Sequence, residues 1–194
     1  MINRKEQIEQ TAISLFRTQG FAATSMRTLA QSLGMEAASI YAHIRSKEEI
    51  LQKVCFRLAD DFFTGFKNAV NKPGTVTEKL QAAIAEHVQV ITENLAAATV
   101  FQTEWRHLSD PYLGQMIQLQ AQYEAGFREL LITGQTNGEF ELTDAHLTAR
   151  ALLASLNGIA RWYNPEGKLT PTEIAANFSQ LFLRGLIKDQ ISNS

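Results

Sequence analysis

Apolar residues recur at helical spacing through almost the whole chain, and glycine, proline and asparagine separate the apolar runs. Ile8, Ala12 and Phe16 lie on one such stripe, which predicts a first helix over about residues 4–18, ended by Gly20. No run alternates with the period of two that is typical of a strand. We therefore expect an all-α fold of about nine helices, the others lying over residues 25–34, 37–44, 46–72, 75–93, 97–108, 111–133, 144–163 and 171–188.

Local capping signals mark the starts of several of these helices. Thr75 with Glu78, and Thr170 with Glu173, have the spacing of a capping box, in which a hydroxyl and a carboxylate each accept from a free backbone N–H group. Ser46 is expected to cap the long fourth helix in the same way.

Composition narrows the class of protein. The chain is 45% apolar and 20% charged, as an ordinary folded protein is. No apolar run approaches the roughly 18–20 residues that span a bilayer, and no basic, apolar leader opens the chain. Cys55 is the only cysteine, which excludes an internal disulfide and favours a reducing compartment. We expect a cytoplasmic protein.

Residues 24–48 carry the most informative pattern. They consist of a short helix, a turn at Gly34, and a second short helix that carries Tyr41 and His43 and is followed by Lys47. This order is typical of a helix-turn-helix, whose second helix lies in the DNA major groove while flanking groups contact phosphates. The chain up to that lysine has six basic and three acidic residues and the remainder has 12 and 17, which favours the N-terminal end as the DNA-facing end.

The segment FRTQGFAATSMRTLAQSLGMEAASIYAHIRSKEEIL resembles the N-terminal module of TetR-family transcriptional regulators, and the resemblance covers about residues 8–51. It implies a helix-turn-helix DNA-binding domain over residues 1–46. It also implies a helical effector-binding and dimerisation domain over residues 47–194. The expected partners are an operator in double-stranded DNA, a small-molecule effector and a second copy of the chain.

The DNA-binding residues follow from chemistry and from this resemblance. The Tyr41 hydroxyl and the His43 imidazole can donate to phosphate oxygens, and the Lys47 ammonium at the start of a helix suits another phosphate. Across the groove, phosphate contact is expected from residues at the start of the second helix, namely Thr24, Ser25 and Arg27. The resemblance implies that base edges are contacted by Ala37, Ala38, Ser39 and Ala42, with Arg27 as an addition.

Alternatives stay open at these positions. Tyr41 also suits a core aromatic, and His43 and Lys47 suit ordinary surface residues. Family members often carry a small hydroxyl residue and a lysine where this chain has Glu36 and Ala37. The alanines offer methyl contacts but no paired hydrogen bonds, so we expect modest reading of base edges and a contribution from DNA shape.

The resemblance implies a dimer interface made from the last two long helices, over residues 144–163 and 171–188. Its expected residues are apolar ones on those helices, namely Leu152, Leu156, Ile159, Phe178, Leu181 and Phe182. The alternative for each is a place in the core of one subunit.

A small-molecule pocket is expected among the fourth to eighth helices, where polar groups interrupt apolar stripes. The candidate lining is aromatic with a few polar groups: His87, Phe101, Gln102, Trp105, Tyr123, Phe127 and Asn157. An interior or surface histidine and core aromatics are the alternatives. The stretches EWRHLSDP and RWYNPEGKLTPTEIA resemble TetR-family members that govern lipid or acyl-coenzyme A metabolism, which implies a fatty acyl or acyl-coenzyme A effector.

The resulting hypothesis is a repressor that a small apolar or acyl-type effector releases from a palindromic operator. The alternative is a DNA-bound protein-interaction module of the same fold without a small ligand. An enzyme is not expected, because the four histidines lack metal-ligand spacing, Cys55 has no neighbouring base and no glycine-rich phosphate loop is present. Neither a metal nor a cofactor is expected.

Overall fold

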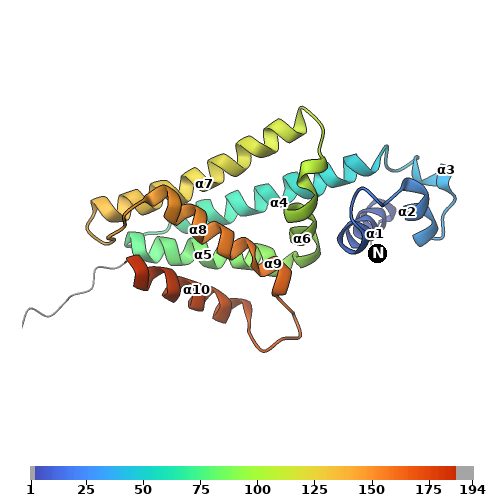
Figure 1. Ribbon diagram of the computed structural model, residues 1–194. Coiled ribbons are helices and arrows are strands. Elements are labelled where there is room, and N and C mark those ends of the chain that lie inside the picture. The colour runs from blue at the N-terminus through green and yellow to red at the C-terminus, as the bar shows by residue number, and fades with distance from the viewer. Residues whose placement is uncertain (1–2, 187–194) are drawn as a thin grey trace, which may run out of the picture. The chain divides into compact units, whose positions relative to one another are not determined.

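The computed structural model describes residues 3–186, and all of the regular structure in that range is helical (Figure 1). The all-α prediction is confirmed, and each expected helix has a counterpart. None of the described helices combines the length and apolar character that crossing a membrane requires. The elements are α1 Arg4–Gln19, α2 Met26–Ser32, α3 Ala37–Ile40, α4 Lys47–Val70, α5 Val76–Glu93, α6 Leu95–Glu104, the 3-10 turn η1 Trp105–His107, α7 Tyr112–Thr136, α8 Ala145–Asn157, α9 Ile159–Trp162 and α10 Pro171–Leu186.

Several helices differ from their expected bounds, among them α6, which ends at Glu104, and α7, which continues to Thr136. Helix α3 ends at Ile40, because the next backbone N–H groups bond three residues back, as His43 N does to the Ile40 carbonyl at 3.0 Å. The expected eighth helix is divided at Gly158, which keeps right-handed dihedral angles between α8 and α9. The expected end of the last helix at residue 188 lies outside the described residues.

The predicted capping boxes are confirmed. Thr75 N donates to Glu78 Oε2 at 2.8 Å, and Glu78 N donates to Thr75 Oγ1 at 3.1 Å. The corresponding bonds between Thr170 and Glu173 are 2.8 and 3.2 Å. These bonds join residues only three apart, which is why the sequence pattern predicts them.

The chain divides into two compact units, which are described separately. The first contains the described residues up to Asp60 together with Asn94–Gln118, and the second contains Asp61–Glu93 and the described residues from Leu119 onward. In the first unit, α1 contacts both α2 and α6, and α2 contacts α3. Its core consists of buried apolar side chains from each of these helices and from the start of α4, among them Ile8, Phe16, Leu29, Ile40, Ile44, Leu51, Val54 and Val100.

The second unit is organised around α5, which contacts α8, α9 and α10 (Figure 1). Leu80, Ile84 and Ile91 are fully buried along one side of α5. Its first turn is capped from a distance, because the Glu139 carboxylate accepts from Val76 N at 3.0 Å and from Thr77 N at 2.8 Å. These hydrogen bonds lower the pKa of Glu139, since they favour its ionised form. The cap ties the loop after α7 to the start of α5.

Candidate nucleic-acid interface and effector region

The helix-turn-helix predicted from the sequence is formed by α2 and α3. Between them Gly34 has a φ of 63°, a left-handed conformation that glycine adopts without strain. Ile40 and Ile44 are buried and anchor α3 and the turn after it. The remaining side chains of this segment are exposed, namely Ala37, Ala38, Ser39, Tyr41, Ala42 and His43. An outward-facing row of small and hydrogen-bonding residues therefore lies where the sequence predicts the recognition helix.

Tyr41 is 55% exposed, which contradicts the alternative of a core aromatic. Arg27 on α2 is exposed as well, and so is Arg45 in the turn before α4. Sequence reasoning did not assign a role to Arg45. The sequence signal for Arg45 was a cationic side chain two residues beyond His43. In the first unit, Arg45 lines the same hollow as Tyr41 and His43.

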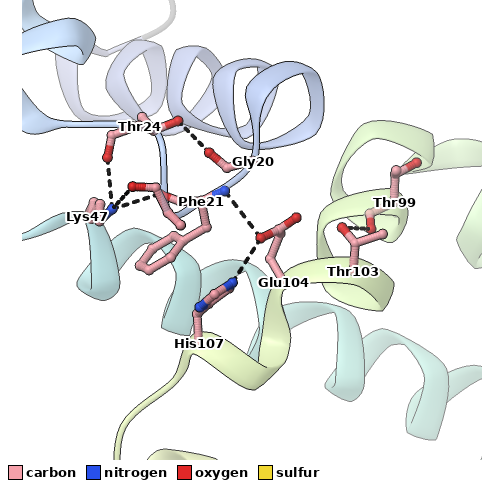
Figure 2. Close-up of polar contacts among 9 residues, drawn as sticks. Gly20, Phe21, Thr24, Lys47, Thr99, Thr103, Glu104 and His107 are labelled. Carbon is pink, nitrogen blue, oxygen red and sulfur yellow. Dashed lines mark hydrogen bonds and ion pairs between the residues drawn. The ribbon is translucent and has the colours of Figure 1, made fainter.

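The two hydroxyl residues at the start of α2 have different roles. Ser25 caps the helix by accepting from Thr28 N at 3.0 Å while remaining exposed. Thr24 is only 1% exposed, and its hydroxyl donates to the Gly20 carbonyl at 2.8 Å (Figure 2). The Thr24 side chain was expected to contact a phosphate, but it is buried and instead closes the turn after α1.

Lys47 also turns inward (Figure 2). Its ammonium donates to the carbonyls of Phe21 at 2.7 Å, Thr24 at 2.8 Å and Ala22 at 3.3 Å. An ammonium has three N–H donors, so these carbonyls account for all of them. In this structure the side chain therefore connects the start of α4 to the turn after α1, and its expected phosphate contact stays a prediction.

The end of α6 contacts the same turn within the first unit. The Glu104 carboxylate accepts from Phe21 N at 3.2 Å and lies 3.5 Å from Nε2 of His107 (Figure 2). The His107 ring stacks on the Phe21 ring, with centroids 5.3 Å apart. The sequence contained no local signal for these contacts, which join residues more than 80 positions apart.

The candidate effector residues fall into two groups. Phe101, Gln102 and Trp105 belong to the first unit, whereas His87, Tyr123, Phe127 and Asn157 belong to the second. In the second unit, Nδ1 of His87 lies 3.1 Å from the Tyr123 hydroxyl, and the rings of Tyr123 and Phe127 are 5.4 Å apart. The structure therefore brings part of the expected set together.

Burial governs the ionisation of this pair. Burial lowers the pKa of His87 to about 3, although the Asn157 side chain acts in the opposite direction and raises this pKa. Burial of the hydroxyl end also raises the pKa of Tyr123. Nε2 of His87 is buried and has no hydrogen-bond partner among the described residues. The pair is therefore neutral, polar and incompletely satisfied.

The residues expected at the dimer interface differ in how far they are buried within one chain. Leu152, Leu156 and Ile159 are at most 1% exposed within one chain, so a partner subunit cannot bury them further. Their expected role is corrected to core packing, because the inward face of α8 and α9 carries them. Phe178 and Phe182 are half-buried, and Leu181 is 67% exposed. Two exposed apolar residues on these helices were not among the expected dimer residues, Leu147, at 66%, and Trp162, at 51%.

These features define the class as a helix-turn-helix DNA-binding protein with a second, helical unit. Residues 8–54 match the family described as "Bacterial regulatory proteins, tetR family", and residues 73–186 match "Tetracyclin repressor-like, C-terminal domain". The chain belongs to the TetR family of transcriptional regulators. The family and its relatives make it a DNA-binding transcriptional regulator of the ligand-responsive type.

Several relatives match over nearly their whole length. The transcriptional repressor KstR2 of Mycolicibacterium smegmatis is 25% identical over 97% of this chain and 93% of its own. The structure of the ketosteroid transcriptional regulator KstR2 of Mycobacterium tuberculosis has a TM-score of 0.91 at 25% identity, covering 97% of both chains. AibR, solved with isovaleryl coenzyme A and operator DNA, shares the fold with a TM-score of 0.80 at 23% identity, over 92% of this chain and 97% of its own.

Proposed function

We propose that this protein is a homodimeric repressor that occupies a palindromic operator and is released by a small apolar or acyl-type effector. Residues 1–46 form the DNA-binding domain of this proposal and residues 47–194 form the effector-binding and dimerisation domain. Its action is regulation of transcription and not catalysis. The observation that carries it is the exposed side of α3, anchored from beneath by Ile40 and Ile44.

In this proposal α3 enters the major groove and contacts base edges with Ala37, Ala38, Ser39 and Ala42. Tyr41, His43 and Ser25 donate to phosphates, and Arg27 and Arg45 supply the positive charge. Each of these side chains is exposed. Two copies of the module must present their recognition helices about 34–36 Å apart to enter successive major grooves.

Dimerisation supplies that pairing. We place the interface on the outward residues of α8, α9 and α10, centred on Leu147, Trp162 and Leu181. Large apolar residues exposed on the last helices of a chain are typical of a surface that a partner covers. Phe178 and Phe182 would lie at its edge, where they are already half-buried.

The effector is proposed to bind in the second unit near His87, Tyr123, Phe127 and Asn157. An acyl-type ligand suits an aromatic lining with a few polar groups. That AibR was solved with both an acyl-coenzyme A and operator DNA is in keeping with such a ligand for this fold. To act as an inducer, the effector must bind the operator-incompetent state more tightly than the operator-bound state.

A selection from random duplexes, followed by titration of the full-length protein, tests the proposal. We expect an enriched inverted repeat, bound by two copies of the chain and released by an added acyl ester. Binding without any enriched sequence would contradict the operator. An enriched operator that no small molecule releases would favour the alternative, a DNA-bound module for protein partners.

A further inference from the structure

His87 carries a polar atom for which the described part of the chain provides no partner. The side chain is 2% exposed, and its Nε2 atom makes no hydrogen bond with any described residue. A buried donor or acceptor left unpaired destabilises a fold by about 1–3 kcal/mol. Most buried polar atoms are satisfied, so an exception needs a physical reason.

The surroundings of the His87 ring are mostly aromatic, and the polar side chains that act on it are Tyr123 and Asn157. The Phe62 ring lies 4.6 Å from the His87 ring between centroids, and 5.7 Å from the Tyr123 ring. Phe66 and Phe127 continue the cluster, with centroids 4.8 Å apart. Gly126 makes room for it, because a Cβ there would lie 2.9 Å from the Phe66 ring. We call these residues, Phe62, Phe66, Tyr123 and Phe127, the aromatic cluster.

The second nitrogen of the ring determines which kind of group Nε2 can bind. The buried phenolic proton of Tyr123 needs an acceptor, and Nδ1 of His87 lies 3.1 Å from the hydroxyl. When the phenol donates to Nδ1, the ring proton of the neutral imidazole is on Nε2. Nε2 is then an N–H donor, and its missing partner is an acceptor.

We propose that Nε2–H of His87 binds a neutral carbonyl oxygen of the effector, as found in a ketone, an ester or a thioester, while the aromatic cluster contacts the adjoining hydrocarbon. This inference rests on the proposed function and specifies the chemistry of its effector. It distinguishes an acyl ester or thioester from a free fatty acid, a choice that the sequence left open.

Charge favours the neutral group. A carboxylate buried among aromatic rings requires a cation or several donors. Burial holds the pKa of His87 at about 3, so the imidazole is uncharged at neutral pH and offers one hydrogen atom. A carbonyl oxygen needs only that one donor. The site therefore suits an uncharged acceptor better than an anion.

The first test needs no ligand. In a double variant, His87→Phe with Tyr123→Phe, both polar partners are removed and similar ring volumes are kept. Because such a replacement removes the unpaired atom as well as the hydrogen bond, we expect an unfolding midpoint equal to or above that of the unaltered protein. A clearly lower midpoint would assign the pair to the stability of the fold and overturn the inference.

The second test uses three probes of equal chain length: methyl laurate, laurate and dodecane. For the unaltered dimer we expect methyl laurate to bind about tenfold tighter than dodecane, since one neutral hydrogen bond contributes about that factor. It should also bind tighter than laurate. In the double variant, the preference for the ester over the alkane should disappear while dodecane binding persists. His146→Phe, at an exposed histidine of the same unit, is the matched control and should keep the preference.

The outcomes separate the two proposals. Tighter binding of laurate than of the ester, an ester preference that survives the double substitution, or no binding of any probe would each overturn the inference. Operator binding measured in the same samples reports on the proposed function. A double variant that still binds the operator, but responds equally to ester and alkane, supports both.

Discussion

The ammonium of Lys47 lies 4.3 Å from the centroid of the Phe21 ring and donates to the carbonyl of the same residue at 2.7 Å. One side chain thus binds both the π face and the backbone of Phe21, in the turn after α1. A cation over an aromatic face contributes about 0.5–2 kcal/mol, depending on how far it is desolvated. The contact joins the first turn of α4 to the turn between α1 and α2.

Replacing Lys47 by methionine should therefore reduce stability before it affects DNA recognition. Lys47→Met keeps most of the aliphatic stem but removes the donor of two short hydrogen bonds. We expect the free energy of unfolding to fall by about 1–3 kcal/mol in a denaturant titration. Lys53→Met is the control, because its partly solvated ion pair with Glu49 contributes about 0–1 kcal/mol. If Lys47→Met keeps full stability but reduces the salt dependence of operator binding, Lys47 contacts a phosphate instead.

Arg45 and Tyr41 should act on phosphates without regard to sequence. Arg45→Ala should weaken binding to specific and nonspecific duplexes alike and reduce the slope of log affinity against log salt by about one. Tyr41→Phe should weaken both to a similar extent with a nearly unchanged slope, because its hydroxyl is neutral. Lys67→Ala, at an exposed position of the second unit, serves as the comparison. Loss of sequence preference alone would argue for base contacts at these positions.

The exposed and buried leucines of the last helices should respond in opposite ways. Leu181→Glu places a charge on a residue that is 67% exposed, so we expect a folded monomer with poor operator affinity. Leu152→Ala removes a buried side chain and should lower the free energy of unfolding by about 2–5 kcal/mol without preventing dimerisation. Sedimentation and denaturant titration measure the two effects. A dimeric Leu181→Glu protein would place the interface elsewhere.

Acid should weaken the cap on α5. Hydrogen bonds from Thr77, then Val76, lower the pKa of Glu139 from its ordinary value of 4.5. The unfolded chain therefore binds this proton more readily, so the contribution is present above the unfolded pKa and is lost as the pH falls through the folded pKa. Thermal unfolding between about pH 7 and about pH 3 should show a smaller loss of midpoint for Glu139→Gln than for the unaltered protein.

Glu141→Gln is the matched control for this measurement, because Glu141 is exposed and lies two residues further along the same loop. It should follow the pH dependence of the unaltered protein. If the Glu139→Gln protein follows that curve as well, protonation of the Glu139 carboxylate is not coupled to folding.

Features that depend on neighbours in the chain were predictable from the sequence. The capping boxes at Thr75 and Thr170 and the turn at Gly34 use bonds or dihedral angles within a few residues, and each leaves a local signature. The order of aromatic, glycine, threonine, Tyr-x-His and Ser-Lys-Glu elements over residues 8–51 predicted the helix-turn-helix and the family. The periodic apolar stripes predicted the helices, because helical spacing is a property of one segment alone.

Features that depend on distant segments became visible only in the folded chain. Lys47 has a sequence position suited to phosphate contact, yet three carbonyls from the turn after α1 take its donors. Leu152 and Leu181 are both apolar residues on amphipathic helices, and packing alone makes one buried and the other exposed. The unpaired Nε2 of His87 likewise follows from which rings surround it. Hydrogen bonding and burial across long sequence separations depend on how helices pack, and no short stretch of residues encodes that packing.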